Sequence, residues 1–216
     1  MPDVVKSARR YNSPRRQQQA AETRRAILLA AQRLFERQGY PLTTMEAVAA
    51  EAGVALKTVY VTFTTKSGLL RAVWDFLLKG DEDVAPVAAR AWYREMLDEP
   101  DPERQLRLTA HNSRLVKVRI GRLLEVIRDA SVVDVDSAAL WSLIQSDFYE
   151  NQGAIVASLD NKHALRPDLD VTRATDILWT LNHPDVWLLM AGQRGWTPDH
   201  FEHWLAETMC AQLLNR

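Results

Sequence analysis

The sequence has one cysteine and no long apolar run, and each of these shortages excludes a class of protein. With Cys210 alone, the chain cannot build an intrachain disulfide framework, and it fits a reducing cytoplasm. Residues 26–31 form one of the longest apolar runs, far short of the roughly 18 residues of a transmembrane helix. The basic N-terminus lacks the apolar core of a secretory signal. We therefore expect a cytoplasmic protein with no membrane partner.

The sequence also lacks the motifs with which enzymes bind phosphate, metals or cofactors. It has no glycine-rich phosphate loop, no nucleophile elbow and no paired-carboxylate motif. Among the five histidines, His200 and His203 stand at i and i+3 of a predicted helix, but no third ligand accompanies them. We therefore expect no metal, no cofactor and no enzymatic activity.

The charges are unevenly divided along the chain, although the formal net charge is only −1. Residues 1–80 hold 13 Lys and Arg against 6 Asp and Glu, whereas residues 81–216 hold 14 against 22. A basic block beside an acidic one indicates that only the first part meets a polyanion. A solvated basic tail is the alternative interpretation of this block.

Residues 43–70 have the pattern of a helix-turn-helix. Thr43 is positioned to cap a first short helix, with Glu46 three residues later as in a capping box. Gly53 ends that helix, because glycine readily adopts the left-handed backbone conformation of a sharp turn. A second helix of about two turns follows over 55–62. Two short helices joined in this way can insert the second into the major groove of DNA.

The rest of the chain has helical periodicity, with no strand-like alternation and no internal repeat. Because three short helices in about 45 residues bury little area, we expect the N-terminal helices to be stabilised by packing against the rest of the chain. Pro184 is expected to kink its helix, and Thr197 to cap the last one. Outside the helix-turn-helix, helices are predicted over 20–38, 65–79, 83–98, 103–130, 134–160, 171–193 and 198–214.

The helix-turn-helix resembles the signature of the TetR/AcrR family of bacterial transcriptional regulators. A whole series of positions matches that signature in order and with the same gaps, which is far more specific than a bare helix-turn-helix pattern. The matching residues are Gly53, Val54, Ala55, Thr58, Val59, Tyr60, Phe63, Lys66, Leu69 and Leu70.

This resemblance implies an all-α fold with an N-terminal three-helix helix-turn-helix domain and a C-terminal helical ligand-binding and dimerisation domain. We expect a disordered basic arm over 1–19, a DNA-binding headpiece with its linking helix over 20–80, and the second domain over 81–216. In the family, the linking helix connects the headpiece to the ligand domain. A tilt of that helix changes the spacing of the two headpieces in a dimer.

The expected DNA contacts lie in and around the second short helix. Leu56, Lys57 and Thr58 begin it, which is the part that meets base edges. Lys57 can donate to guanine O6 or N7. Tyr60 and Lys66 match family positions that usually contact phosphate. The full set of DNA-contact candidates is Thr44, Leu56, Lys57, Thr58, Tyr60, Thr62 and Lys66.

Two departures from the family signature bear on operator recognition rather than on the fold. Ala55 stands where the family often has a serine or threonine that caps the recognition helix. Val61 and Thr62 stand where the family often has a larger or more polar pair. In the basic arm, four arginines can reach phosphates or an adjacent minor groove, and an inert tail is the alternative.

The second domain is expected to hold a mostly apolar pocket between its helices, with a few polar groups. A plain core role is the alternative for every candidate. The mixed lining favours a hydrophobic or aromatic small-molecule effector. The pocket candidates, all at inward helical positions, are Thr109, Ser113, Trp141, Phe148, Tyr149, Gln152, Trp179 and His183.

The C-terminal segments resemble the dimer interface of one branch of the family. They contain a tryptophan-bearing helix with an internal proline, a Gly-Trp-Thr-Pro turn and a final amphipathic helix. We therefore expect a homodimer formed through residues 171–193 and 198–214, as a four-helix interface.

Three functional hypotheses follow. The leading one is a homodimeric repressor that a small-molecule ligand releases from a palindromic operator in double-stranded DNA. The second is a helix-turn-helix activator or architectural protein without ligand input, and the response to added ligands separates the two. The third, from another class, is an all-helical enzyme whose headpiece resemblance is accidental.

Overall fold

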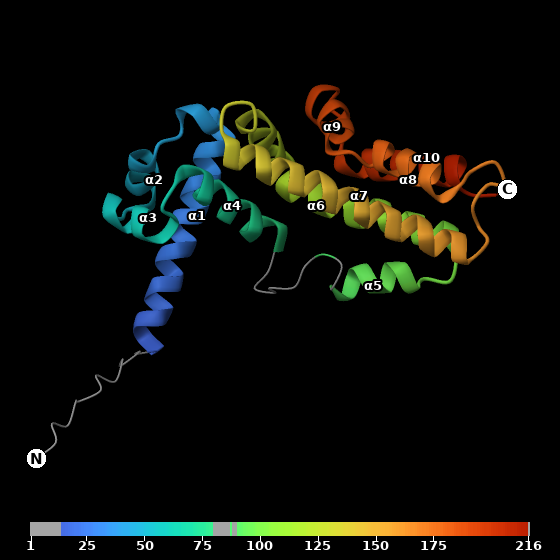
Figure 1. Ribbon diagram of the computed structural model, residues 1–216, viewed down its shortest axis with the longest axis horizontal. Helices are drawn as coiled ribbons and strands as arrows, with labels where there is room; N and C mark the ends of the chain where they lie inside the picture. Colours follow the sequence, from blue (N-terminus) through green and yellow to red (C-terminus); the bar gives the residue numbers. More distant parts are fainter. Residues whose placement is uncertain (1–13, 80–86, 88–89, 216) are drawn as a thin grey trace, which may run out of the picture.

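The computed structural model describes residues 14–79, 87 and 90–215, and every regular element in these ranges is a helix. The predicted all-α fold is therefore confirmed. The molecule is elongated, with the N-terminal helices gathered at one end and two long antiparallel helices running to the other (Figure 1). No helix in the described part of the chain is both long and apolar enough to cross a membrane.

The first helix, α1 (Pro14–Leu42), begins earlier than predicted. Its first residues fall within the basic arm predicted over 1–19, whereas residues 1–13 lie outside the described residues. Proline suits the first turn of a helix, and the glutamines that follow are good helix formers. Gln18 also donates to Glu22 one turn further on (3.1 Å). Local propensity therefore extends the helix into a segment whose charge suggested an arm.

Two short helices, α2 (Met45–Ala52) and α3 (Leu56–Phe63), form the predicted helix-turn-helix. Gly53 between them has φ 66° and ψ 33°, the left-handed conformation, and its N–H closes the end of α2. Ala55 is the N-cap of α3 and makes no side-chain capping bond, as its side chain predicts. Val59 and Phe63 are buried, which fixes the face of α3 that turns to the core.

The N-cap of α2 is Thr44 and not, as predicted, Thr43. The Thr44 side chain accepts a hydrogen bond from the N–H of Ala47 (3.1 Å). The fully buried Thr43 hydroxyl instead donates to the carbonyl of Gly39 (2.8 Å), where α1 loses its helical geometry. The cap lies one residue later because Thr43 already closes the end of α1. Glu46 is consequently one position too early for a capping box.

The headpiece shares its core with the rest of the chain. The linking helix α4 (Lys66–Lys79) and the facing ends of α6 (Pro102–Ala130) and α7 (Val135–Asn161) pack with it. Phe35 of α1 and Ile127 of α6 are both fully buried in the same apolar cluster. The N-terminal helices therefore pack against the rest of the chain, as expected.

A second core lies toward the other end of α6 and α7. It is formed with α5 (Ala91–Asp98), α8 (Val171–Leu181) and α10 (Pro198–Leu213). The helix predicted over 83–98 is seen only from Ala91, since most residues before it lie outside the described ranges. Thr197 is the N-cap of α10, as predicted, and its side chain accepts from the N–H of His200 (3.1 Å).

The single kinked helix predicted over 171–193 is wrong. Beyond α8 the chain forms α9 (Pro184–Trp187) and then the π-helix η2 (Leu188–Gln193). Proline lacks the N–H that would continue the hydrogen-bond ladder, so Pro184 begins a new helix instead of bending the old one. His183 is the N-cap of α9, with Nδ1 accepting from the N–H of Asp185 (3.2 Å).

Candidate functional site

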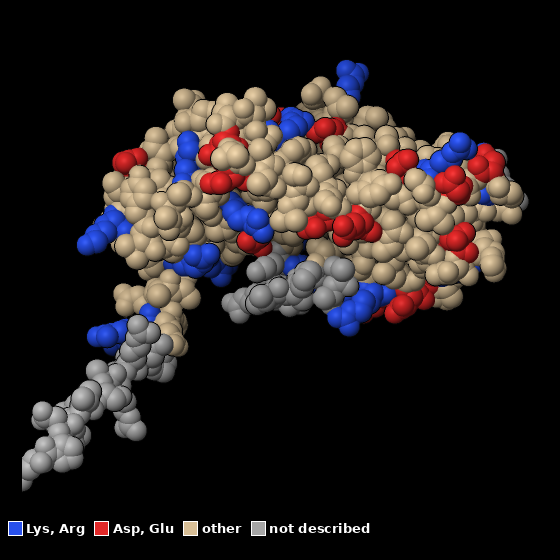
Figure 2. Space-filling view, viewed as in Figure 1, with Lys and Arg blue, Asp and Glu red and all other residues tan. Residues whose placement is uncertain are grey.

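The outer face of α3 projects from the headpiece. Lys57 is exposed, Tyr60 is 45% exposed and Val61 is 76% exposed. Figure 2 shows Lys and Arg side chains projecting at this end of the molecule and along α1. A short helix with a lysine in its first turn and an exposed tyrosine behind it can approach a DNA groove, because both side chains can reach phosphates or base edges.

The other DNA-contact candidates differ in how exposed their side chains are and in whether they already form hydrogen bonds. Thr44 is exposed at the start of α2; its oxygen accepts from a backbone N–H, so its hydroxyl proton is available for a phosphate. Leu56 packs partly against the headpiece core. The Thr62 hydroxyl donates to the carbonyl of Thr58 (2.7 Å). The structure therefore brings the candidates together at one end, but only Thr44, Lys57 and Tyr60 have exposed side chains.

Lys66 is partly buried, and its amine lies at the C-terminal end of α1. Its Nζ donates to the carbonyl of Tyr40 (2.9 Å) and lies 4.2 Å from the centre of the Tyr40 ring. In this conformation, Lys66 holds the end of α1 against the start of α4. An ammonium group has three N–H donors, so Lys66 can contact a phosphate while it keeps this bond.

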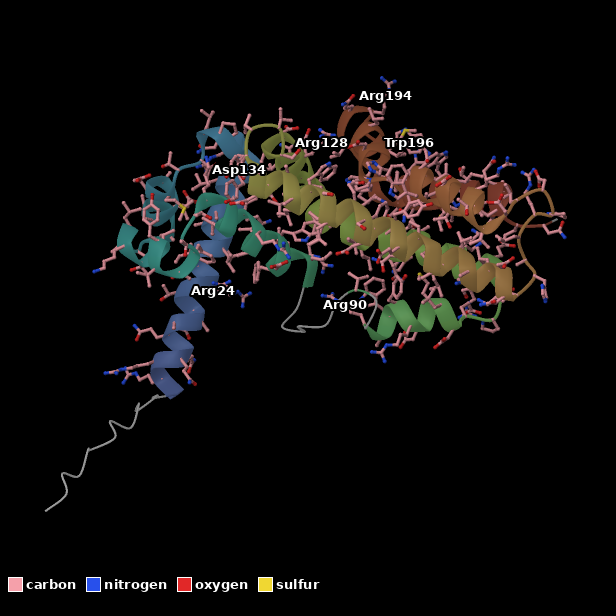
Figure 3. The ribbon with its side chains drawn as sticks, viewed as in Figure 1. Arg24, Arg90, Arg128, Asp134, Arg194 and Trp196 are labelled. Carbon is pink, nitrogen blue, oxygen red and sulfur yellow. The ribbon has the colours of Figure 1, made fainter. Side chains whose placement is uncertain are left out.

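Val61 and Arg24 were not among the predicted contacts. Val61 stands where the family often has a larger or more polar residue, yet it is the most exposed apolar side chain of α3 and can touch a thymine methyl. The Arg24 guanidinium lies over the Phe63 ring, 4.6 Å from its centre, and so ties α1 to α3; Arg24 is labelled in Figure 3. The helical periodicity of the apolar residues places Val61 on the solvent-exposed face of its helix, and this position could have identified it as a contact candidate.

A polar junction joins the headpiece to the N-terminal end of α7. The Tyr40 hydroxyl donates to Asp134 (3.1 Å), and the Ser67 hydroxyl donates to Asp136 (3.0 Å); Asp134 is labelled in Figure 3. Burial and the bond to Asp134 raise the pKa of Tyr40 to about 12. Burial opposes the ionised form of Asp134, but bonds from Ser137 and Tyr40 hold its pKa below the ordinary value. Both groups therefore keep the form that makes the junction.

A cavity of about 400 Å³ lies among α4, α5, α6, α7 and the α8–α9 connection. This is within the range of small-molecule sites. Four of the eight predicted pocket residues line it: Thr109, Ser113, Phe148 and Gln152. The main apolar lining residues, which sequence reasoning did not identify, are Trp74, Leu78, Trp92, Tyr93, Met96, Val116, Ile120, Leu124, Ile144 and Ile155.

The other four predicted pocket residues lie elsewhere. Trp141 packs against the headpiece core. The Tyr149 hydroxyl donates to Asp176 (3.0 Å), and its ring lies edge-on to Trp179. Trp179 in turn contacts the ring of His183, 4.7 Å away, so these three residues line the contact between α7 and α8. Helical spacing marked them as inward, but it does not distinguish which neighbour an inward side chain faces.

A buried lysine, Lys117, lies at the cavity wall and was missed because lysines are usually exposed. Its Nζ donates to Ser113 and to Asn182, the Ser113 hydroxyl also donates to Asn182, and Asn182 donates to Gln152 (3.1 Å). We call these four residues the Lys117 network. Burial lowers the pKa of Lys117 to about 7. The amine is therefore neutral in a large share of molecules at neutral pH.

Replacing Lys117 by methionine is expected to stabilise the protein by about 1–4 kcal/mol at pH 6, as when buried charges give way to apolar groups. The pKa of Lys117 is about 7 in the folded protein and 10.5 for an ordinary lysine. Between these two pH values, the unfolded chain therefore binds more protons than the folded protein. The free energy of unfolding of the wild type therefore rises with pH in this window. Thermal unfolding at pH 6 and pH 9 should show the gain from Lys117→Met shrinking at the higher pH. An equal gain at both values would contradict a neutral folded amine.

In the described part of the chain, no group of three or more His, Cys, Asp and Glu side chains could hold a metal ion. Of the pair considered from the sequence, His200 stacks flat on Trp196, with ring centres 4.2 Å apart. Its environment is that of a packed surface histidine.

Comparison with known proteins gives consistent results. Residues 27–73 match the family model described as bacterial regulatory proteins of the tetR family. The chain is 30% identical over 166 residues to the probable HTH-type transcriptional regulator ArpR of Pseudomonas putida. The aligned region covers 74% of this chain and 76% of ArpR.

Solved structures of other proteins share the fold, among them NalD and SmeT. NalD, the secondary repressor of the MexAB-OprM multidrug efflux pump of Pseudomonas aeruginosa, superposes with a TM-score of 0.69 at 22% identity, over 91% of this chain and 98% of NalD. SmeT in complex with triclosan gives a TM-score of 0.69 at 19% identity, over 89% and 92%. With the helix-turn-helix, the shared fold and the match to ArpR in agreement, this chain belongs to the TetR family of bacterial regulatory proteins.

Proposed function

We propose that this DNA-binding transcriptional regulator is a homodimeric repressor, released from a palindromic operator by a hydrophobic or aromatic small molecule. This proposal rests on helix α4, which contributes side chains both to the headpiece core and to the cavity. Leu69 and Leu70 of α4 are fully buried in the headpiece core, and Trp74 and Leu78, one and two turns later, line the cavity. A ligand in the cavity therefore touches the helix on which the headpiece is built.

The headpiece, residues 20–80, is the DNA-binding part of this proposal. Lys57 reads a base edge from the first turn of α3, while Tyr60 and Thr44 bind phosphates on either side. In a dimer, two such helices enter successive major grooves about one helical turn apart. The operator is accordingly a near-palindrome with half-sites at that spacing.

The remaining part, residues 81–216, binds the effector and forms the dimer. The dimer contact uses residues 171–193 and 198–214. Leu189 on η2 is 51% exposed, and several other apolar side chains of this surface are only partly buried in the single chain. Burying them against a second copy would extend the core across the two-fold axis.

Ligand and operator are linked through the orientation of α4. If the effector binds best to the form in which the headpieces are wrongly spaced, it lowers DNA affinity, and DNA must weaken the effector by the same factor. That SmeT was solved with triclosan supports an aromatic effector here. Small apolar aromatic compounds are therefore the first to screen.

The test of ligand release is a reciprocal titration. Compounds that raise the melting temperature are added to a protein–operator complex followed by fluorescence anisotropy, and the same compounds are titrated with and without operator. We expect the factor by which a compound weakens operator binding to equal the factor by which operator weakens binding of that compound. Tight operator binding that no bound compound alters would instead favour the activator or architectural hypothesis.

The polar junction should transmit part of this coupling. Tyr40→Phe removes the hydrogen bond to Asp134, and we expect it to reduce the ligand–operator coupling by about 0.5–2 kcal/mol, as found for residues between coupled sites. Tyr149→Phe is the matched control, because it removes a similar tyrosine–aspartate bond outside the cavity and the junction. Equal effects of the two variants in the reciprocal titration would mean that the junction carries no coupling.

A further inference from the structure

The Lys117 network presents hydrogen-bond donors to a mostly apolar cavity. The Lys117 side chain is only 5% exposed. Its partners are the neutral oxygens of Ser113 and Asn182, with the Phe201 ring 5.4 Å away. No carboxylate of the described residues forms an ion pair with it. An amine buried without a counter-ion is costly in its charged form, and an anion brought by a ligand would remove that cost.

Gln145 offers a second donor at the same side of the cavity. Because His183 Nδ1 accepts the N–H of Asp185, its Nε2 carries the proton and donates to Gln145 Oε1 (3.1 Å). The Gln145 amide nitrogen is left buried and without a partner among the described residues. Gln145 lines the cavity. Since Lys117 bonds Asn182 and Gln145 bonds the next residue, both donors flank the α8–α9 connection.

The charged groups around Lys117 are few and mostly solvated. Asp147 and Glu150 of α7 also line the cavity, but both are exposed. His183 lies close enough for Lys117 to help lower its pKa, after burial as the main cause. Behind Lys117, a smaller hollow also contains Arg122 and Glu125, which pair with each other. The negative charges are thus at the rim, and the donors are inside.

We propose that the cavity binds an amphipathic carboxylic acid, whose carboxylate pairs with Lys117 and whose apolar body lies against the aromatic side chains of α4 and α5. Gln145 Nε2 donates to a further acceptor of the same ligand. The inference rests on the proposed function for the cavity as the effector site, and it specifies the chemical class. Ion pairing with a buried amine is stronger than a neutral hydrogen bond, and Lys117 is buried, so an acid gains more there than its amide.

The test uses matched probes: 1-naphthoate, 4-phenylbutyrate and decanoate, each against its primary amide. Binding is followed by tryptophan fluorescence, since Trp74 and Trp92 line the cavity, and by calorimetry at pH 8 in buffers of different ionisation enthalpy. We expect at least one acid to bind about tenfold more tightly than its amide, the difference between a charged and a neutral hydrogen bond. We also expect uptake of close to one proton, because the amine becomes charged on binding.

Lys117→Met should abolish both the preference for the acid and the proton uptake, while leaving the affinity for the amide within about threefold. Lys162→Met is the control: Lys162 is another partly buried lysine, which donates to Gln105 outside the cavity, and this variant should keep both effects. Equal binding of acids and amides, binding of no acid, or an acid preference that survives Lys117→Met would overturn the proposal.

Operator release separates this inference from the proposed function. If amides bind and release operator DNA as well as the acids do, the carboxylate inference fails and the repressor stands. If the acids bind with the expected preference and leave operator affinity unchanged, the carboxylate site stands and the ligand-release part of the function fails.

Discussion

Replacing Lys57 by alanine is expected to weaken operator binding at least about 30-fold, because each base contact in a half-site is worth about 1–3 kcal/mol and a dimer makes two. Lys57 is exposed in the first turn of α3, where a recognition helix meets base edges. Anisotropy titrations of operator and of random duplex at one fixed salt concentration measure the effect. The loss should be much larger for operator than for random DNA.

Two further variants calibrate that result. Tyr60→Phe removes the hydroxyl that we propose contacts a phosphate, so it should weaken binding of operator and of random DNA by a similar, smaller factor. Arg104→Ala removes an exposed positive charge at the start of α6, away from the headpiece, and should leave operator affinity unchanged. If Lys57→Ala lowered affinity for both duplexes equally, Lys57 would be a phosphate contact and α3 would read bases with other residues.

Phe35→Ala is expected to lower the free energy of unfolding by about 3–5 kcal/mol, the usual cost of deleting a buried phenylalanine. Phe35 is fully buried and stacks on Tyr40, with ring centres 6.0 Å apart. Urea unfolding followed by circular dichroism gives the value. One fixed protein concentration is used because the stability of the proposed dimer would depend on concentration.

Ile127→Ala is the companion variant, with an expected loss of about 2–5 kcal/mol. Ile127 lies on α6, far from Phe35 in the sequence but in the same apolar cluster. Since the headpiece and the α6–α7 end share this core, both variants should shift one cooperative transition. A separate, earlier transition of the headpiece in Phe35→Ala, absent from Ile127→Ala, would show that the two parts fold independently.

The headpiece was predictable from sequence because its signals are local. Gly53, the apolar positions of α3 and the exposed Lys57 and Tyr60 all follow from spacing within a few turns, and the structure has them in the predicted elements. Errors there were small, such as the N-cap at Thr44 instead of Thr43. They arose because the end of α1 competes for the same hydroxyl.

The cavity was only half predictable because it depends on which helices meet. Thr109 and Phe148 lie where expected, but the walls supplied by α4 and α5 come from segments far away in the sequence. Lys117 was missed for a different reason. A lysine is ordinarily exposed, and only the packing of Asn182 and Phe201 around it shows that this one is buried.

The central claim is sequence-specific binding of DNA by a dimer, and selection of random duplexes by the purified protein tests it most directly. The wild type and Lys57→Ala should be compared in parallel at the same salt concentration. We predict an enriched inverted repeat with half-sites about one helical turn apart, enriched much less by Lys57→Ala. Recovery of no motif, with only weak and salt-sensitive binding, would contradict the account.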